Sequence, residues 1–291
     1  MLLLLLLLLL IARYGCNAVG NVIRTLPEGE PVRGVTSLDD HLYVIRGNQS
    51  SDQIEVYDID SFRLLRNMTV PELFNAVDIV ACGHYRCAYV SEGASRCLHR
   101  VTLPHAGITR WPVNDVPGCL SLTVQHTVLV TCRKVCKIKE FTTDGHLLRE
   151  VVVPASSPWH TVQLSNGELI VCHGFDEDYS MLQRVCLICS DGQIVKSHGE
   201  SVGAGSRRMN TPSHMAVDRN DFVFVVDRNN CRVLLLSPTL TRIREVVSRK
   251  LLQWKPYRLS VDVKRRRLYV AVNERLKYGD YTAGRVIVVN V

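Results

Sequence analysis

Short apolar runs separated by polar turns make up most of the chain. Residues 211–237, TPSHMAVDRNDFVFVVDRNNCRVLLLS, contain three such runs and two tight turns, which predicts three antiparallel strands. No stretch of comparable length has apolar residues at helical spacing, so we expect an all-β protein. Apolar triplets that we interpret as the second strands of a repeat lie at residues 42–44, 88–90, 128–130, 169–171, 223–225 and 268–270.

The repeat has a constant internal order. An inner strand that begins near a proline or glycine precedes the triplet, and a third strand and an outer strand follow it. The triplets end 40 to 54 positions apart, a period typical of a β-propeller blade. We therefore predict one domain over residues 20–291, a six-bladed β-propeller of four-stranded blades. The expected blades span about residues 31–70, 71–113, 114–153, 154–201, 202–248 and 249–291.

The two ends of the predicted domain complement each other. The last repeat ends at Val291 with its third strand and has no outer strand of its own. Residues 21–26, NVIRTL, precede the first repeat and resemble the outer strands elsewhere. We expect this N-terminal strand to complete the sixth blade and close the ring, which would leave only short, protected sheet edges.

The fifth repeat carries a family resemblance. HMAVDRNDFVFVVDRNNCRVLLLS, from His214 to Ser237, closely resembles an NHL repeat, with apolar alternation, then V-x-D, then N-N-x-R-V. The second and third repeats depart from it, with Glu92 and Cys132 at the usual aspartate position. The resemblance implies a six-bladed propeller. Such propellers bind protein or single-stranded RNA at the ends of tripartite-motif proteins, and they also form the catalytic domain of the peptidyl-amidating lyase.

One polar position recurs near the start of the inner strands, counted back from each second strand. We expect these side chains to ring one mouth of the central channel, where they could bind an anion or zinc, or simply face water. In the amidating lyase a zinc-binding histidine directly follows the proline, where this chain has Trp159 and Ser213. We therefore predict no metal, no cofactor and no catalytic residue. The predicted ring is Arg33, Asp78, Cys119, His160, His214 and Arg258.

Basic and aromatic residues cluster in the loops at this same end of the predicted propeller. With 35 basic and 28 acidic residues, the net charge of +7 is too mild to indicate DNA binding by itself. We predict a non-enzymatic module that binds a protein or peptide partner. Single-stranded RNA is the first alternative, and a metal-dependent, amidating-lyase-like enzyme is the second. The predicted partner-binding face comprises Arg46, Arg133, Trp159, His160, His173, Arg207, Arg208, His214, Tyr257 and Arg258.

The leader leaves the cellular compartment open. Residues 1–19 begin with an apolar leucine run that is too short to span a bilayer and lacks a basic start. It is either a signal peptide, which predicts secretion, or a low-complexity start, which predicts a cytoplasmic protein. Asn48 and Asn67 are candidate glycosylation sites if the protein is secreted. The pairs Cys82–Cys87 and Cys132–Cys136 flank hairpins and could bridge, although buried free thiols are the commoner outcome.

Overall fold

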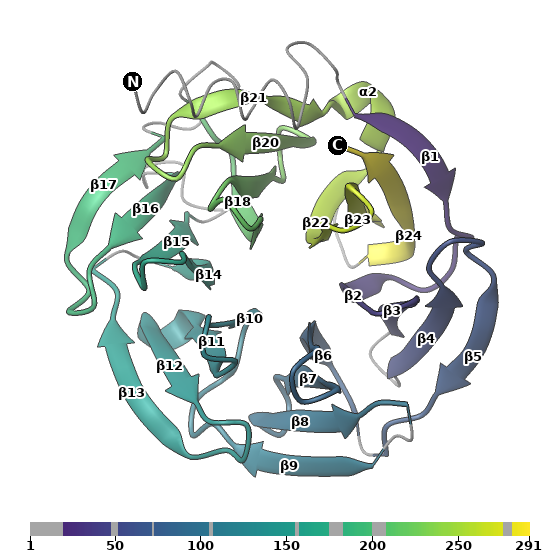
Figure 1. Cartoon of the computed structure of the whole chain (residues 1–291), viewed down its shortest axis with the longest axis horizontal. Helices are drawn as coiled ribbons and strands as arrows, with labels where there is room; N and C mark the ends of the chain where they lie inside the picture. The colour runs from purple at the N-terminus through teal and green to yellow at the C-terminus, as the bar shows by residue number, and fades with distance from the viewer. Residues whose placement is uncertain are drawn as a thin grey trace.

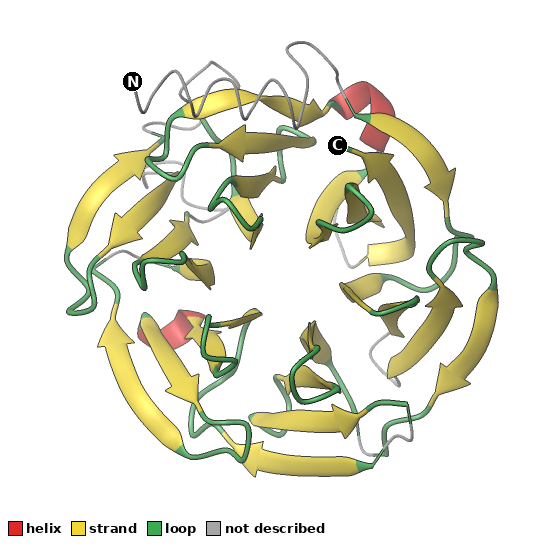
Figure 2. Cartoon of the chain, viewed as in Figure 1, coloured by secondary structure: helices red, strands yellow, loops and turns green. Residues whose placement is uncertain are grey.

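Strands dominate the part of the chain that can be described. The computed structural model describes residues 20–47, 52–71, 73–104, 107–154, 157–174, 183–199, 208–275 and 281–291. Within these ranges, helix is confined to the 3-10 turn η1 (Arg133–Val135) and the single turn α2 (Arg249–Leu252), as Figure 2 shows. None of the helices described is long and apolar enough to cross a membrane. The leader 1–19, Asn48 and Arg207 lie outside the described residues.

The described strands form six four-stranded antiparallel sheets arranged around a central axis (Figure 1). This confirms the prediction of an all-β six-bladed propeller. From the innermost strand outward, blades one to three are β2 (Val32–Leu38), β3 (His41–Gly47), β4 (Asp52–Asp58), β5 (Leu64–Met68); β6 (Ala76–Cys82), β7 (Cys87–Glu92), β8 (Cys97–Thr102), β9 (Ile108–Pro112); β10 (Leu120–Leu122), β11 (Val128–Cys132), β12 (Lys137–Phe141), β13 (Leu147–Val152).

The remaining three blades follow the same order. They are β14 (Pro158–Gln163), β15 (Leu169–His173), β16 (Arg184–Ile188), β17 (Ile194–His198); β18 (Pro212–Val217), β19 (Val223–Asp227), β20 (Arg232–Leu236), β21 (Arg242–Val247); β22 (Lys255–Asp262), β23 (Arg267–Arg275), β24 (Tyr281–Asn290), β1 (Asn21–Thr25).

The N-terminal strand closes the ring, as predicted. β1 pairs antiparallel with β24, so the first described strand is the outer strand of the last blade (Figure 1). Leu26, just beyond β1, is buried, and its N–H donates to the Val286 carbonyl at 2.8 Å. At the opposite face of the propeller, Arg265 forms ion pairs with Asp40 at 2.8 Å and with Asp60 at 3.0 Å, which join blades six and one. Ring closure therefore combines a sheet edge with an ion-pair network.

Burial explains why the second strands are apolar on both faces. Every residue of β11, β15 and β19 is buried, because each of these strands is covered by a neighbouring blade on either side. The outer strands are different: β5 and β13 expose most of their side chains. The core therefore consists of apolar layers between adjacent blades, such as the cluster of Phe224, Val233 and Leu268 between blades five and six.

Candidate functional site

A β-bulge near the start of the inner strands sets the geometry of the channel. The pairing register shifts between Pro158 and His160, and between Pro212 and His214, and the same shift occurs in blades one, two and six. A bulge places two residues opposite one and interrupts the alternation of side chains. Trp159 and Ser213 are the bulged residues, so the directions of His160 and His214 do not follow from simple alternation along the strand.

Pairing register also identifies the ring position in each blade. His160 pairs with Cys172 and His214 with Val226, each one residue past the apolar triplet. In blade one the residue at that register is Gly34, paired with Ile45, whereas Arg33 is the bulged residue. The first hairpin is one residue shorter than those of blades three to five, so counting along the sequence selected Arg33 in place of Gly34. The central ring, as the structure places it, is Gly34, Asp78, Cys119, His160, His214 and Arg258.

Two ring histidines connect neighbouring blades. The His160 Nδ1 accepts the N–H of Met215 at 3.0 Å, and its Nε2 donates to the Leu120 carbonyl at 3.0 Å. His160 thus joins the inner strands of blades three, four and five. The Nδ1 of His214 accepts the N–H of Leu259 in blade six at 3.4 Å. The imidazoles of His160 and His214 are stacked, with their ring centroids 4.0 Å apart. Both rings are therefore neutral and carry their proton on Nε2.

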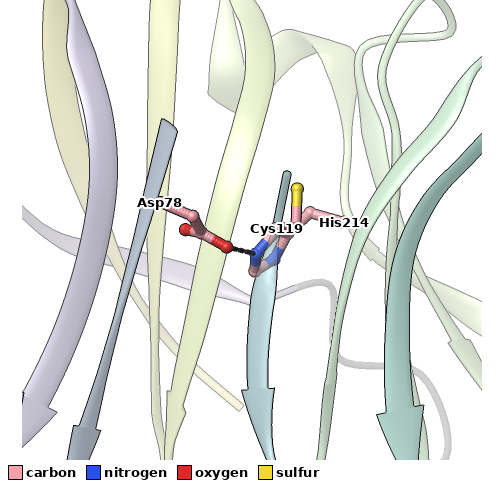
Figure 3. A group of neighbouring side chains, drawn as sticks. All are labelled: Asp78, Cys119 and His214. Carbon is pink, nitrogen blue, oxygen red and sulfur yellow. Dashed lines mark hydrogen bonds and ion pairs between the residues drawn. The ribbon is translucent and has the colours of Figure 1, made fainter. Parts of the chain in front are cut away.

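Asp78 is the anionic centre of the ring. Its Oδ2 accepts the His214 Nε2–H at 3.2 Å and the Leu120 N–H at 2.9 Å. Its Oδ1 lies 3.3 Å from the Nε of Arg258, an ion pair between two side chains that are each 1% exposed. Figure 3 shows Asp78 pointing toward His214, with Cys119 beside them. The ring thus pairs one buried negative charge with one buried positive charge.

The surroundings shift the pKa of each ring group. Burial opposes ionisation of Asp78, but His214 and Arg258 outweigh burial and lower the pKa of Asp78 to about 2. Burial lowers the pKa of His160 and of His214 below the ordinary 6.5. It raises the pKa of the Cys119 thiol to about 12. At neutral pH the ring therefore holds an ionised aspartate, an arginine, two neutral histidines and a protonated thiol.

A metal ion fits this ring poorly, although Asp78, Cys119 and His214 bring ligand atoms within 4.8 Å of one another. Two of the three ligand groups are already committed, Asp78 to Arg258 and His214 to Asp78 and Leu259. A divalent cation would add positive charge next to the buried guanidinium of Arg258, which is costly at low dielectric. The donor set is organised as a hydrogen-bonded, charge-balanced cluster.

A cavity of about 210 Å³ opens at the mouth where the inner strands begin, which we call the entry mouth. The Arg133 guanidinium lies 3.9 Å above the Trp159 ring, and that of Arg258 lies 4.0 Å from the Tyr257 ring. Among the described residues that line the cavity there is no carboxylate. The cavity is also lined by Lys134, Val116 and Pro117, which the predicted face did not include. They lie near Trp159 and Tyr257 because blades three, four and six converge at this mouth.

Half of the predicted face lies below the surface. Arg46 is 5% exposed, pairs with Glu55 at 2.6 Å and donates to the carbonyls of Pro27 and Gly284. His173 is also buried, and its Nε2 accepts from the Nε of Arg184 at 2.9 Å. Arg208 is exposed. The buried members of the predicted face are Arg46, His160, His173, His214 and Arg258, whereas Arg133, Trp159 and Tyr257 are half-buried around the cavity.

A larger chamber of about 510 Å³ occupies the opposite mouth, at the hairpins between inner and second strands. Inner strands of all six blades line it, and His160 and His214 belong to its wall. Cys119 and Arg258 belong instead to the entry cavity. The central ring therefore lies between two cavities.

Cysteines in the described part of the chain are free thiols, ten in all. Cys82 and Cys87 face each other in the strand register and are both buried. Cys186 is buried and Cys189 is half-buried. Asn67, the candidate glycosylation site within the described residues, is exposed on the outer strand β5.

Comparisons with known proteins place the fold. A scan against known families finds no match, and neither does a search of curated proteins. Among solved structures, the chain is similar to virginiamycin B lyase from Staphylococcus aureus, with 11% identity and a TM-score of 0.60 over 91% of this chain and 99% of that one. It is also similar to a putative gluconolactonase, at 14% identity and a TM-score of 0.66 over 94% and 93% of the two chains.

A third solved structure, the PQQ-bound aldose sugar dehydrogenase from Streptomyces coelicolor, has 14% identity and a TM-score of 0.65 over 94% of this chain and 99% of that one. At such identities the likeness shows the fold alone. Membership of the NHL family therefore stays a prediction. What is shown is that the chain has the architecture of a six-bladed β-propeller.

Proposed function

We propose that the chain is a non-enzymatic, NHL-like recognition propeller that binds a protein or peptide partner at its entry mouth. The observation that supports this most strongly is the small cavity with aromatic walls, Trp159 and Tyr257, and a basic rim of Arg133 and Lys134. Tyrosine, tryptophan and arginine in a pocket are the residue types that dominate binding energy at protein interfaces.

Cavity size supports a peptide over a free small molecule. Drug-sized ligands occupy pockets of roughly 300–1,000 Å³. The entry cavity, at about 210 Å³, is smaller and suits one apolar anchor side chain. Asp78 balances the charge of Arg258, and Arg133 and Lys134 bring two further cationic side chains to the rim. The partner segment therefore combines an apolar anchor with neighbouring carboxylates, which pair well with guanidinium groups.

Fluorescence anisotropy with labelled peptides tests this proposal. A peptide with a central leucine or phenylalanine flanked by glutamates is expected to bind, and its lysine-flanked counterpart is expected to bind at least tenfold more weakly. Arg133→Glu should weaken binding of the glutamate peptide at least tenfold. Lys196→Glu makes the same charge change on the exposed outer strand β17 and should leave binding unchanged. Equal binding of both peptides, or of neither, would contradict the proposal.

Single-stranded RNA remains the alternative, because stacked arginine–aromatic pairs also accept bases. Labelled oligouridine in the same assay separates the two. RNA that binds more tightly than the peptides, with affinity falling steeply as salt rises, would replace the peptide proposal. The metal-dependent lyase has weaker support, since the ring's donor groups are committed to one another.

A further inference from the structure

The chamber at the hairpin mouth is separate from the entry cavity and is within the size range of small-molecule sites. Its volume of about 510 Å³ compares with the roughly 300–1,000 Å³ typical of ligand pockets. The strand register explains why it exists. Two residues beyond each ring position, every blade carries a small or medium side chain, and no aromatic residue fills the channel there. These residues are Thr36, Val80, Ser121, Val162, Ala216 and Ser260.

Three of these side chains bring hydroxyl groups to the chamber from blades one, three and six. The Ser121 side chain is 8% exposed, and its Oγ has no hydrogen-bond partner among the described residues. The Thr36 Oγ1 accepts the Ala81 N–H at 3.1 Å, so its own proton is left to donate. Ser260 is half-buried at the wall. Buried hydroxyls are normally hydrogen-bonded, so we expect the Ser121 Oγ to bond to a group that the described residues do not supply.

Among the described residues that line the chamber, the charged side chains are Asp218, Arg219 and Asp221, all in the β18–β19 hairpin at the rim. His160 and His214 are neutral, because burial lowers the pKa of both rings. The Oδ1 of Asp218 accepts the N–H groups of Asn220 and Phe222, and Asp221 accepts both the N–H and the hydroxyl of Ser165. Both carboxylates thus stabilise hairpins at the rim. A charged ligand would lose its hydration here without gaining a counter-ion deep in the chamber.

We propose that this chamber binds a small, neutral, polyhydroxylated molecule about the size of a monosaccharide. The ligand's hydroxyls exchange hydrogen bonds with Thr36, Ser121 and Ser260, and the apolar residues between them contact its carbon skeleton. This site does not depend on the peptide site, since the two cavities lie on opposite sides of the central ring.

Isothermal titration calorimetry with D-glucose, myo-inositol and D-glucuronate tests the proposal. At least one neutral compound should bind with a dissociation constant in the millimolar range or below, and glucuronate at least tenfold more weakly. Ser37→Leu fills the chamber and should abolish binding, whereas Ser197→Leu, the same change on exposed β17, should not. The double variant Ser121→Ala/Ser260→Ala should weaken binding at least tenfold with its circular dichroism spectrum unchanged.

Several results would overturn this proposal. The proposal is wrong if neither neutral compound binds, or if glucuronate binds as tightly as the neutral compounds. It is also wrong if Ser37→Leu and the double alanine variant both bind as tightly as the wild type. Because the probes are sugars and inositol, a negative result leaves the peptide assay at the entry mouth unaffected.

Discussion

At the scale of single residues, the central ring is first of all a set of bridges between blades. His160 satisfies the Leu120 carbonyl and the Met215 N–H, and Asp78 satisfies the Leu120 N–H. These backbone groups lie on the free edges of inner strands, where an unsatisfied buried group costs about 1–3 kcal/mol. The sequence indicated that polar residues recur at this position. It gave no sign that their partners would be backbone groups of neighbouring blades.

Gly34 shows how tightly the inner strands of blades one and two meet. A Cβ at this position would lie 2.8 Å from the Ile79 Cγ2 and 2.9 Å from the Ile79 backbone nitrogen. We predict that Gly34→Ala lowers the free energy of unfolding by about 1–3 kcal/mol, because the backbone of Ile79 must shift. Urea denaturation measures this. Gly107→Ala is the matched control, since the closest atom to its Cβ would be 3.7 Å away. Equal midpoints for the two variants would argue against close packing at Gly34.

At the scale of elements, the strands follow directly from the hydrophobic pattern, but their register does not. Second strands such as β19 carry an unbroken apolar run, here Val223 to Val226, because neighbouring blades cover both of their faces. Bulges in the inner strands and one shorter hairpin move the ring position from Arg33 to Gly34. A bulge depends on how one strand pairs with the next, so counting residues along the chain misses it.

Ring closure by β1 predicts a difference between two residues at the same chain end. Leu26 is 1% exposed in the core between blades six and one, whereas Val22 on β1 is 39% exposed. Leu26→Ala should lower the free energy of unfolding by about 2–5 kcal/mol, since it leaves a cavity. Val22→Ala should change it by less than about 0.5 kcal/mol. Chemical denaturation with both variants checks this, and a small effect of Leu26→Ala would mean that the N-terminal strand does little to hold the ring.

At the scale of the whole molecule, a charge-balanced ring between two cavities joins the blades around the axis. The entry cavity carries the basic and aromatic residues, and the opposite chamber carries the hydroxyls. The two mouths therefore differ in chemistry although every blade contributes the same four strands. Function, on this view, depends on which side chains each blade places at each mouth.

Buried neutral histidines make the stability of the whole ring depend on pH. Burial lowers the pKa of His160, His214 and His173 below 6.5, the last to about 4, so the folded state binds fewer protons than the unfolded chain. Their contribution is fully present above pH 6.5 and is lost as the pH falls below it. We predict a decrease of about 1.4 kcal/mol per pH unit for each histidine that the unfolded state protonates.

Urea midpoints measured from pH 7.5 to 5.0 check this pH dependence. His160→Gln removes one titrating group and should flatten the profile even if it lowers the overall stability. A wild-type midpoint that stays constant across this range would show that these imidazoles are not held neutral in the folded state.

The amino-acid sequence alone was enough to predict the blade count, the order of strands within a blade and closure by the N-terminal strand. All of these depend on hydrophobic periodicity and turn residues, which are local properties. It also identified Arg133, Trp159 and Tyr257, which line the entry cavity. The folded structure was needed to show that Arg46 and His173 are buried, that Gly34 replaces Arg33 in the ring, and that a chamber opens behind the histidines. These features arise where different blades meet, and contacts between distant segments have no local pattern that a single sequence displays.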